Sequence, residues 1–426
     1  MNMNISDMLL GFAVFWPLLL AIPKLHSYLP RVRHLAVLPA AILILMPDNA
    51  FLQLPRFLFG SGLSLDDDIR WILGMFIILW FTAASLSKPH NSETSTQETS
   101  FFLLTLCGNL GVILSNDLIA FFSFSTLMSY SFYALIVEKR DAPSRHAGQW
   151  YLRFLLVADL ALFEAMLLAA SLSEDLRYDL VRQEMTGDYS SLYMWMVVLG
   201  FVLKSGVWPF YFWLTTTFNS CTRTTRVLLG GVPVAMGLLG LLRWLPLGEG
   251  DYYTAGIFIF ILGAMAISHS ILRIFKHGFN VMLSAWFSIA ATGLFCITLG
   301  SVLIEPALWQ TYENLSFPFI ALLGTILASL SLIKEKVPHS HQPANAITLF
   351  SQTKFKLYGN KLTTIRRQTA SILQDFQSKL NAVYLSIIDQ CQSYSTDHKL
   401  VLLLTGWKVK ITLFVILGLA FAWLAK

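Results

Sequence analysis

The sequence predicts an all-α, polytopic membrane protein with about 12 transmembrane helices and one long amphipathic lateral helix. Hydrophobic residues make up 55% of the 426 residues and charged residues only 13%, with a mean hydropathy of +0.61. Soluble domains carry about 25% charged residues, so this chain has more apolar surface than one soluble core could bury. Its apolar segments are continuous runs, whereas the strands of an outer-membrane barrel would alternate. These observations exclude a soluble enzyme, a peripheral anchor and an outer-membrane barrel.

Twelve apolar runs follow one another along the chain, and each is a candidate membrane span. They lie near 8–23, 35–54, 69–86, 101–115, 117–137, 149–172, 190–214, 227–247, 254–275, 279–304, 315–333 and 409–425. The first run follows a start without Lys or Arg, and no small-residue cleavage site interrupts the runs after it. We therefore expect a first membrane span there and not a cleaved signal peptide.

The loops between these runs alternate in charge. Cations follow the odd-numbered runs, as at Lys139 and Arg140, and the even-to-odd loops are acidic or poor in cations, as at 173–189. The near-neutral loop 88–100 is the exception. By the positive-inside rule we expect an inner (cytoplasmic) membrane protein with both termini and the 173–189 loop outside, and with 334–408 on the cytoplasmic side.

Residues 338–400 form a polar stretch unlike the rest of the chain. Between Leu362 and Ile387, apolar residues recur at three- and four-residue steps with charged residues between them, which predicts an amphipathic helix. Too polar to span, this helix should lie along the membrane surface or the flank of a neighbour. A cytosolic loop with helical character is the alternative. His339 and His341 in this stretch give no metal-ligand spacing.

Lys204 is the sharpest single feature, because it lies in the middle of the seventh run, about ten residues from either end. An ionisable group at that depth is costly unless it faces a hydrated cavity or a partner, which favours a function in a proton or ion path. Gly206 and Pro209 follow directly, and the proline removes a helical hydrogen bond, so we expect the helix to break just beyond the lysine. The alternative is a structural tie to a buried acid.

The sixth run supplies two candidate acids, Asp159 and Glu164, with Arg153 near its start. Arg153 and Glu164 share a helix face but lie about 16 Å apart, so they cannot pair directly. Glu164 is deep enough to be the counter-charge of Lys204. Asp159 is as well suited to a tie with backbone groups or with the surroundings of Arg153. For both acids, function and structural pairing remain equally good interpretations.

Hydroxyl side chains form stripes on two of the runs, which would line a water chain or join helices by hydrogen bonds. Of these two interpretations, helix packing is favoured. One stripe is on the fifth run and the other on the tenth: Ser123, Thr126, Tyr130 and Tyr133, and then Asn280, Ser284, Ser288 and Thr292. On the ninth run, His269 and Arg273 lie four residues apart near its inner end, where an interfacial anchoring role is expected.

Residues 202–214 read Val-Leu-Lys-Ser-Gly-Val-Trp-Pro-Phe-Tyr-Phe-Trp-Leu. This stretch resembles the Lys-Ser-x-x-x-Pro-Phe-x-x-Trp-Leu signature of the antiporter-like subunits of respiratory complex I and of the Mrp sodium/proton antiporters. Residues 115–118 read Ser-Asn-Asp-Leu and run into Leu-Met-Ser at 127–129, which is similar to a second family motif. The tenth run, from 284 to 293, looks like a loose form of a third. The likeness covers roughly 69–304 and implies that Lys204 is the proton-accepting lysine.

The chain also departs from the family pattern. Thr126 stands where the family's fifth helix has a glutamate that pairs with the lysine, and Gly230 stands where its eighth helix has a histidine. The family usually has a second lysine in a second half, whereas the 315–333 run holds no charge. The resemblance therefore implies a shortened member with a partly degenerate proton path. The amphipathic segment and final run resemble the lateral arm of the family's longest member type, which braces neighbouring subunits.

These inferences divide the chain into five parts. They are an N-terminal three-helix segment at 1–100, a first antiporter-like five-helix repeat at 101–250, a shortened second repeat at 251–337, the amphipathic lateral segment at 338–408 and a C-terminal transmembrane helix at 409–426. The candidate proton path comprises Lys204, Glu164, Asp159, Thr126, Ser288 and Thr292, with the helix break at Gly206 and Pro209.

Three function classes follow from the sequence and the resemblance. One is a proton- or sodium-moving membrane subunit of a multi-subunit complex, including a non-catalytic subunit of an oxidoreductase of the NADH:quinone or hydrogenase type. The second is the membrane half of an inorganic-carbon uptake complex with a soluble, zinc-containing, carbonic-anhydrase-like partner, and the third is a purely structural scaffold. The expected partners are other membrane subunits, the lipid bilayer and, in some cases, a soluble catalytic subunit; nucleic acid is not expected. The four cysteines form neither a Cys-x-x-Cys nor a Cys/His set, so no metal and no cofactor is expected.

Overall fold

The computed structural model describes residues 5–26, 32–46, 48–54, 60–87, 93–173, 175–184, 190–248, 252–277, 282–312 and 319–320. All of them lie within one compact unit, Met1–Lys336. The predicted runs near 315–333 and 409–425 and the amphipathic segment 338–408 lie outside or almost wholly outside the described residues. The predicted domain boundaries therefore stay predictions.

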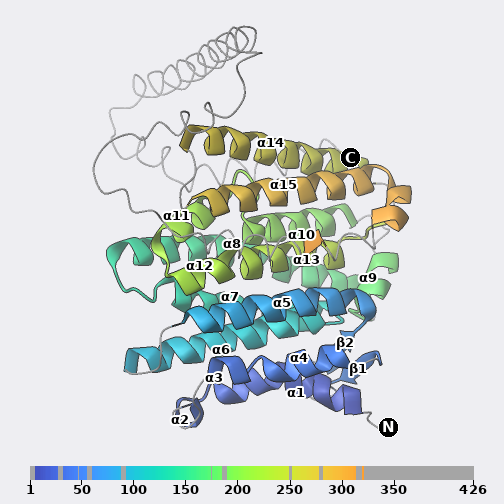
Figure 1. The fold of residues 1–426 in the computed structure, drawn as a ribbon. Helices are drawn as coiled ribbons and strands as arrows, with labels where there is room; N and C mark the ends of the chain where they lie inside the picture. The colour runs from blue at the N-terminus through green and yellow to red at the C-terminus, as the bar shows by residue number, and fades with distance from the viewer. Residues whose placement is uncertain are drawn as a thin grey trace, which may run out of the picture. The chain divides into compact units, whose positions relative to one another are not determined.

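The described residues are almost entirely helical, and the helices run roughly parallel and antiparallel to one another (Figure 1). The first half comprises α1 (Ile5–Leu20), α2 (Pro23–His26), α3 (Val32–Leu35), α4 (Leu38–Leu45), α5 (Asp67–Leu86), α6 (Glu93–Leu114), α7 (Leu118–Ile136), α8 (Ala142–Leu172) and α9 (Tyr178–Glu184). The second half comprises α10 (Ser190–Ser205), α11 (Phe212–Ser220), α12 (Arg223–Leu229), the π-helical turn η2 (Gly230–Val234), α13 (Ala235–Trp244), α14 (Tyr253–His277), α15 (Leu283–Ile304) and the 3₁₀ turn η3 (Pro306–Leu308).

Seven of the described helical segments are long and apolar enough to cross a membrane, and three shorter apolar helices accompany them. Many large apolar side chains on these helices face outward, including Trp71 and Phe275 at 68% and 84% exposure. A soluble protein rarely exposes so much apolar surface, whereas a bilayer would cover it. The predicted class, an all-helical polytopic membrane protein, is confirmed. The predicted total of twelve spans is not, because two of the runs fall beyond the described helices.

The second predicted run, 35–54, is wrong in its second half. The helix α4 ends at Leu45, and the chain then forms a short antiparallel hairpin of β1 (Ala50–Gln53) and β2 (Gly62–Leu65), with Ala50 opposite Leu65. The sequence Pro47-Asp48-Asn49 between helix and strand consists of residues that favour turns over helix. Apolar content alone does not distinguish a short buried strand from the end of a helix.

Polar contacts join this hairpin to the start of α7, and further contacts join α13 to the end of α6. Asp117 is the N-cap of α7, and its carboxylate accepts hydrogen bonds from the Ala120 and Gly62 backbone N–H groups, both at 2.7 Å. Burial raises the pKa of Asp117, although these N–H donors act in the opposite direction. On α13, the buried Arg243 guanidinium donates to the Val112 and Ile113 carbonyl groups, both at 2.7 Å. These contacts satisfy carbonyl groups that the C-terminus of α6 would otherwise leave unpaired.

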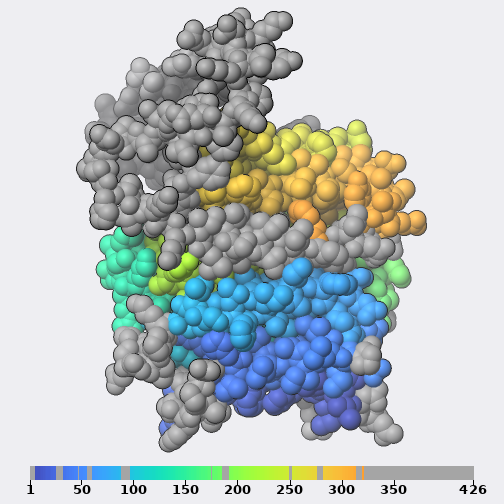
Figure 2. All heavy atoms as spheres, viewed as in Figure 1, coloured from blue at the N-terminus to red at the C-terminus, as the bar shows by residue number. Residues whose placement is uncertain are grey.

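Glycines bring α14 and α15 into close backbone contact. Gly256 faces Gly300 and Gly263 faces Gly293, and a Cβ atom added at Gly263 would lie 2.5 Å from the Gly293 carbonyl oxygen. Small residues at such positions let membrane helices approach closely enough to pack their backbones. The space-filling view shows the joint surface of α14 and α15 in yellow and orange (Figure 2). It lies on the opposite side of the described helical bundle from the blue surface of the N-terminal elements.

Candidate functional site

Lys204 lies in the last turn of α10, directly before a break in the seventh apolar run of the sequence, 190–214. The helix ends at Ser205, Gly206 adopts a left-handed conformation with φ +65°, and a new helix, α11, starts at Phe212. A Cβ atom at Gly206 would lie 3.3 Å from the Trp213 ring, so both backbone conformation and space favour glycine there. The break places the Lys204 ammonium at a helix C-terminus, where the helix dipole stabilises a cation.

Other groups of the same segment bond to the backbone carbonyls freed by the break. The Trp213 indole N–H donates to the Leu203 carbonyl oxygen at 3.0 Å, and the Val207 N–H donates to the Val202 carbonyl oxygen at 3.2 Å. A broken helix is tolerated at membrane depth only when its freed backbone groups find such partners. The interruption is therefore held in a fixed conformation beside Lys204.

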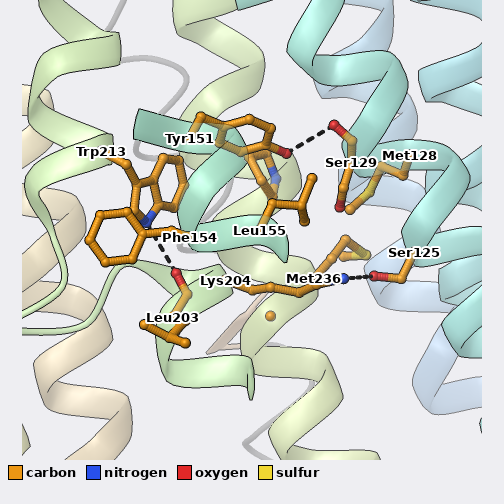
Figure 3. A pocket seen from close by; sticks show the side chains of 12 residues that line it. Ser125, Met128, Ser129, Tyr151, Phe154, Leu155, Leu203, Lys204, Trp213 and Met236 are labelled. Carbon is orange, nitrogen blue, oxygen red and sulfur yellow. Dashed lines mark hydrogen bonds between the residues drawn. The ribbon is translucent and has the colours of Figure 1, made fainter. Parts of the chain in front are cut away.

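The Lys204 side chain is buried and contacts two polar groups on two other helices. Its Nζ lies 2.8 Å from Asp159 Oδ1 on α8. It also donates a hydrogen bond of 2.7 Å to Ser125 Oγ on α7 (Figure 3). Lys204 and Asp159 are each only 8% exposed. Because the acid neutralises the charge of the ammonium, the pair carries no net charge and both groups can be buried in a membrane span.

The Asp159 carboxylate has acceptor capacity to spare. Both of its oxygen atoms are buried, and the Tyr130 hydroxyl of α7 interacts with the carboxylate without well-aligned hydrogen-bond geometry. The 2.8 Å contact with Nζ is thus an ion pair whose angle lies outside hydrogen-bond geometry. Because an ionised carboxylate offers about four acceptor positions, Asp159 retains room to receive a proton or a further hydrogen-bond donor.

A small cavity lies directly beside the ion pair. It is lined by side chains from α7, α8, α10, η2 and α13 and by Trp213 of α11. Lys204 extends across it toward Ser125 (Figure 3). Most of the lining is apolar, and the polar exceptions include Ser129 and Tyr151, whose hydroxyl donates to the Ser129 carbonyl oxygen at 3.2 Å. The geometry provides a protonatable pair at the edge of a cavity inside the helical bundle.

The predicted pairing of Glu164 with Lys204 is wrong. Asp159 makes the ion pair, whereas Glu164 lies on the exposed face of α8. The two acids are five residues apart, or about 500° around an α-helix, so they point to different faces. Depth along the helix was the only basis for choosing Glu164, and depth gives no information about which face points toward α10.

The hydroxyl stripe predicted on α7 reaches the site only in part, because Tyr130 interacts with the Asp159 carboxylate whereas Thr126 does not contact Lys204. Thr126 donates to the Phe122 carbonyl oxygen of its own helix at 2.8 Å, whereas its neighbour Ser125 contacts Lys204. Ser125 and Ser129 are buried and lie four residues apart, so they share the face toward the cavity. Thr126 and Tyr130 have the same spacing on another face, so spacing alone does not single out the two serines.

The remaining candidate residues lie on α14 and α15, away from the cavity. Ser288 and Thr292 are fully buried on α15 and do not line it, and Thr292 donates to the Ile289 carbonyl oxygen of its own helix. The His269 ring lies 5.0 Å from that of Tyr211 in the break, and the Arg273 guanidinium lies 5.7 Å from the Trp286 ring. Sequence analysis missed Arg243, a buried cation near the end of α13 that serves the C-terminus of α6.

Residues 115–273, which contain every element of this cavity, match the sequence model of the family described as "NADH:quinone oxidoreductase/Mrp antiporter, TM". Curated relatives include the Na(+)/H(+) antiporter subunit A1 of Staphylococcus aureus strains JH9 and Newman. Each is 26% identical over 267 residues, which is 56% of this chain and 33% of theirs. The chain thus spans about a third of the length of these relatives.

Two solved structures share the fold. One is the Mrp complex from Dietzia sp. DQ12-45-1b, with a TM-score of 0.61 at 15% identity, covering 77% of this chain and 64% of that one. The other is the membrane-bound sulfane sulfur reductase, an archaeal respiratory membrane complex, with a TM-score of 0.59 at 14% identity, covering 73% and 69%. Residues 115–273 thus resemble the antiporter-like membrane subunits of the complex I/Mrp type, and the described helices share the fold of two such complexes. The resemblance drawn from residues 202–214 is confirmed.

Proposed function

We propose that this chain is a proton-moving membrane subunit of a larger ion-translocating complex, and that the proton passes through the Lys204–Asp159 pair. The single observation that carries the proposal is this buried ion pair at a helix break beside a cavity. Intramembrane ionisable residues are rare and costly, and those that line cavities mark ion and proton pathways.

The chemistry of the pair suits a proton that arrives and leaves. With one shared proton the pair is neutral overall, whether the proton is on Lys204 Nζ or on Asp159, so either arrangement avoids a net buried charge. A second proton leaves the pair with one net positive charge, which the low-dielectric surroundings disfavour and which promotes release. The pair therefore holds one proton readily and a second one only transiently.

Ser125 supports the lysine in both protonation states. A hydroxyl group accepts a hydrogen bond from the ammonium and, after rotation, donates one to the neutral amine. At 2.7 Å from Nζ it fixes the side chain across the cavity without setting its charge. Asp159 on α8 thus supplies the counter-charge that the family resemblance places on the preceding span, where this chain has Thr126.

We place the chain in an inner membrane with both termini outside, among other membrane subunits. A bicarbonate-transporting role beside a zinc-containing soluble partner and a purely structural role are the alternatives. The ion pair argues for transport over scaffolding, because a helix break with a buried lysine and aspartate costs stability that a scaffold does not need.

Asp159→Asn should lower proton movement on the order of a hundredfold, because the neutral amide neither balances Lys204 nor accepts its proton. The measurement is proton uptake into membrane vesicles that carry the native complex, followed with a pH-sensitive dye while the complex is energised. Asp175→Asn is the matched control, since Asp175 is exposed and pairs with Arg177 in a loop. Native gel electrophoresis checks assembly. Wild-type proton movement in an assembled Asp159→Asn complex would contradict the proposed proton path. The scaffold role and the bicarbonate-transporting role would then remain.

A further inference from the structure

Glu164 is an acid on an otherwise apolar, outward-facing surface of α8. Its neighbours on that face are Leu160, Phe163 and Leu167, exposed by 62%, 40% and 48%. This face takes no part in the Lys204 site, because α8 reaches that site through Asp159. Glu164 therefore has a role that the proposed proton path does not explain.

From its position along α8, we place the carboxyl group of Glu164 deep in the hydrocarbon region. It is eight residues from the C-terminal end of α8 at Leu172, or about 12 Å at 1.5 Å per residue, and much farther from the other end. Exposed leucines lie on both sides of it along the helix, at Leu156 and Leu167. A glutamate side chain is too short to reach the membrane surface from that depth, so lipid alone is an unfavourable neighbour.

Within the described part of the chain, Glu164 has no hydrogen-bond or ion-pair partner. On α10, which packs against α8, the intramembrane cation is Lys204, and Asp159 neutralises it. Arg243 donates to backbone carbonyls and a serine hydroxyl at the end of α6. The cations of the described bundle that lie at membrane depth are thus already engaged elsewhere.

From this charge imbalance we infer that the outer face of α8 docks a transmembrane helix of a partner subunit that presents a Lys or Arg side chain to Glu164. Only a cation both neutralises the carboxylate and donates hydrogen bonds to it, which is the usual condition for an acid at this depth. The surrounding leucines and Phe163 supply the apolar contact area around the pair. This inference concerns assembly and is independent of the proposed proton path.

The first test uses dicyclohexylcarbodiimide, an apolar reagent that adds to protonated carboxyl groups within membranes. A Glu164 paired with a partner cation is ionised and covered, so it should resist the reagent in native membranes. The same full-length chain produced without its partners should be labelled at Glu164, with Glu164→Gln identifying the labelled position. Equal labelling in both membranes would show a lipid-facing acid, and absence of labelling in both would show a cover within this chain. Either result overturns the inference.

The second test is charge reversal in the assembled complex. Glu164→Lys should lower the recovery of partner subunits with the purified chain by roughly tenfold, whereas Glu164→Asp should retain most of it. Glu184→Lys is the matched control, because Glu184 is exposed at the end of α9 and outside the membrane spans. Replacing the partner's basic residue with an acid should restore recovery with Glu164→Lys. Full recovery of the Glu164→Lys complex without that change would contradict the docking surface.

Discussion

Lys204→Met should abolish proton movement by the assembled complex. Methionine fills similar volume but carries no proton, so the pair loses its exchangeable ammonium. Asp159 is then left buried without its counter-charge 2.8 Å away, and it takes up a proton and becomes neutral. Assembly should therefore survive while transport falls to background, as measured by dye-monitored proton uptake in membrane vesicles.

Two further variants separate charge from proton exchange. Lys204→Arg keeps the positive charge, but a guanidinium does not give up its proton in proteins, so transport should be lost although the ion pair persists. Lys139→Met is the control, because Lys139 is exposed beyond the end of α7. Transport by Lys204→Arg at the wild-type rate would mean that Lys204 provides only a fixed charge.

Gly263→Leu should prevent α14 and α15 from packing and should sharply lower the yield of folded protein. Even a Cβ atom at this position would lie 2.5 Å from the Gly293 carbonyl oxygen and 2.8 Å from the Ile297 backbone nitrogen. Backbone atoms cannot rotate away, so the two helices must separate and lose contact along their whole length. Overpacking a close-packed site typically lowers the free energy of unfolding by about 1–3 kcal/mol, and a leucine here should lower it by more.

Gly74→Ala is the matched control for the helix pair. Gly74 lies within α5, and a Cβ atom there would meet only the Ile44 Cδ1 atom at an ordinary 3.7 Å. Alanine should therefore be tolerated, with a small gain from its better helix propensity. Thermal unfolding monitored in detergent compares the two variants. Equal stability of Gly263→Leu and the wild type would mean that the two helices are not held by close backbone contact.

Sequence patterns predicted most of the helices because membrane spans carry a strong, local signal. Ten of the apolar runs correspond to described helices, and the break in the seventh follows from a glycine and a proline within a few residues of each other. The hairpin at Ala50–Gln53 and Gly62–Leu65 escaped prediction, because its strands are too short to show alternation.

The site was only half predictable for a geometric reason. A charged residue at membrane depth is visible in one sequence, so Lys204 could be singled out, but its partner depends on how neighbouring helices are rotated. Asp159 and Ser125 face the lysine, whereas Glu164 and Thr126 lie on other faces. Rotation follows from packing contacts between helices, and these are not encoded in the position of one residue along one helix.

The most direct measurement of the central claim is a double-mutant cycle on proton movement with Lys204→Met, Asp159→Asn and the two combined, in assembled complexes. If the two side chains act as one proton-carrying pair, each single change removes transport and the double change removes no more. The account predicts that strong non-additivity. Proton movement above background in the double variant, or at the wild-type rate in either single variant, would contradict it.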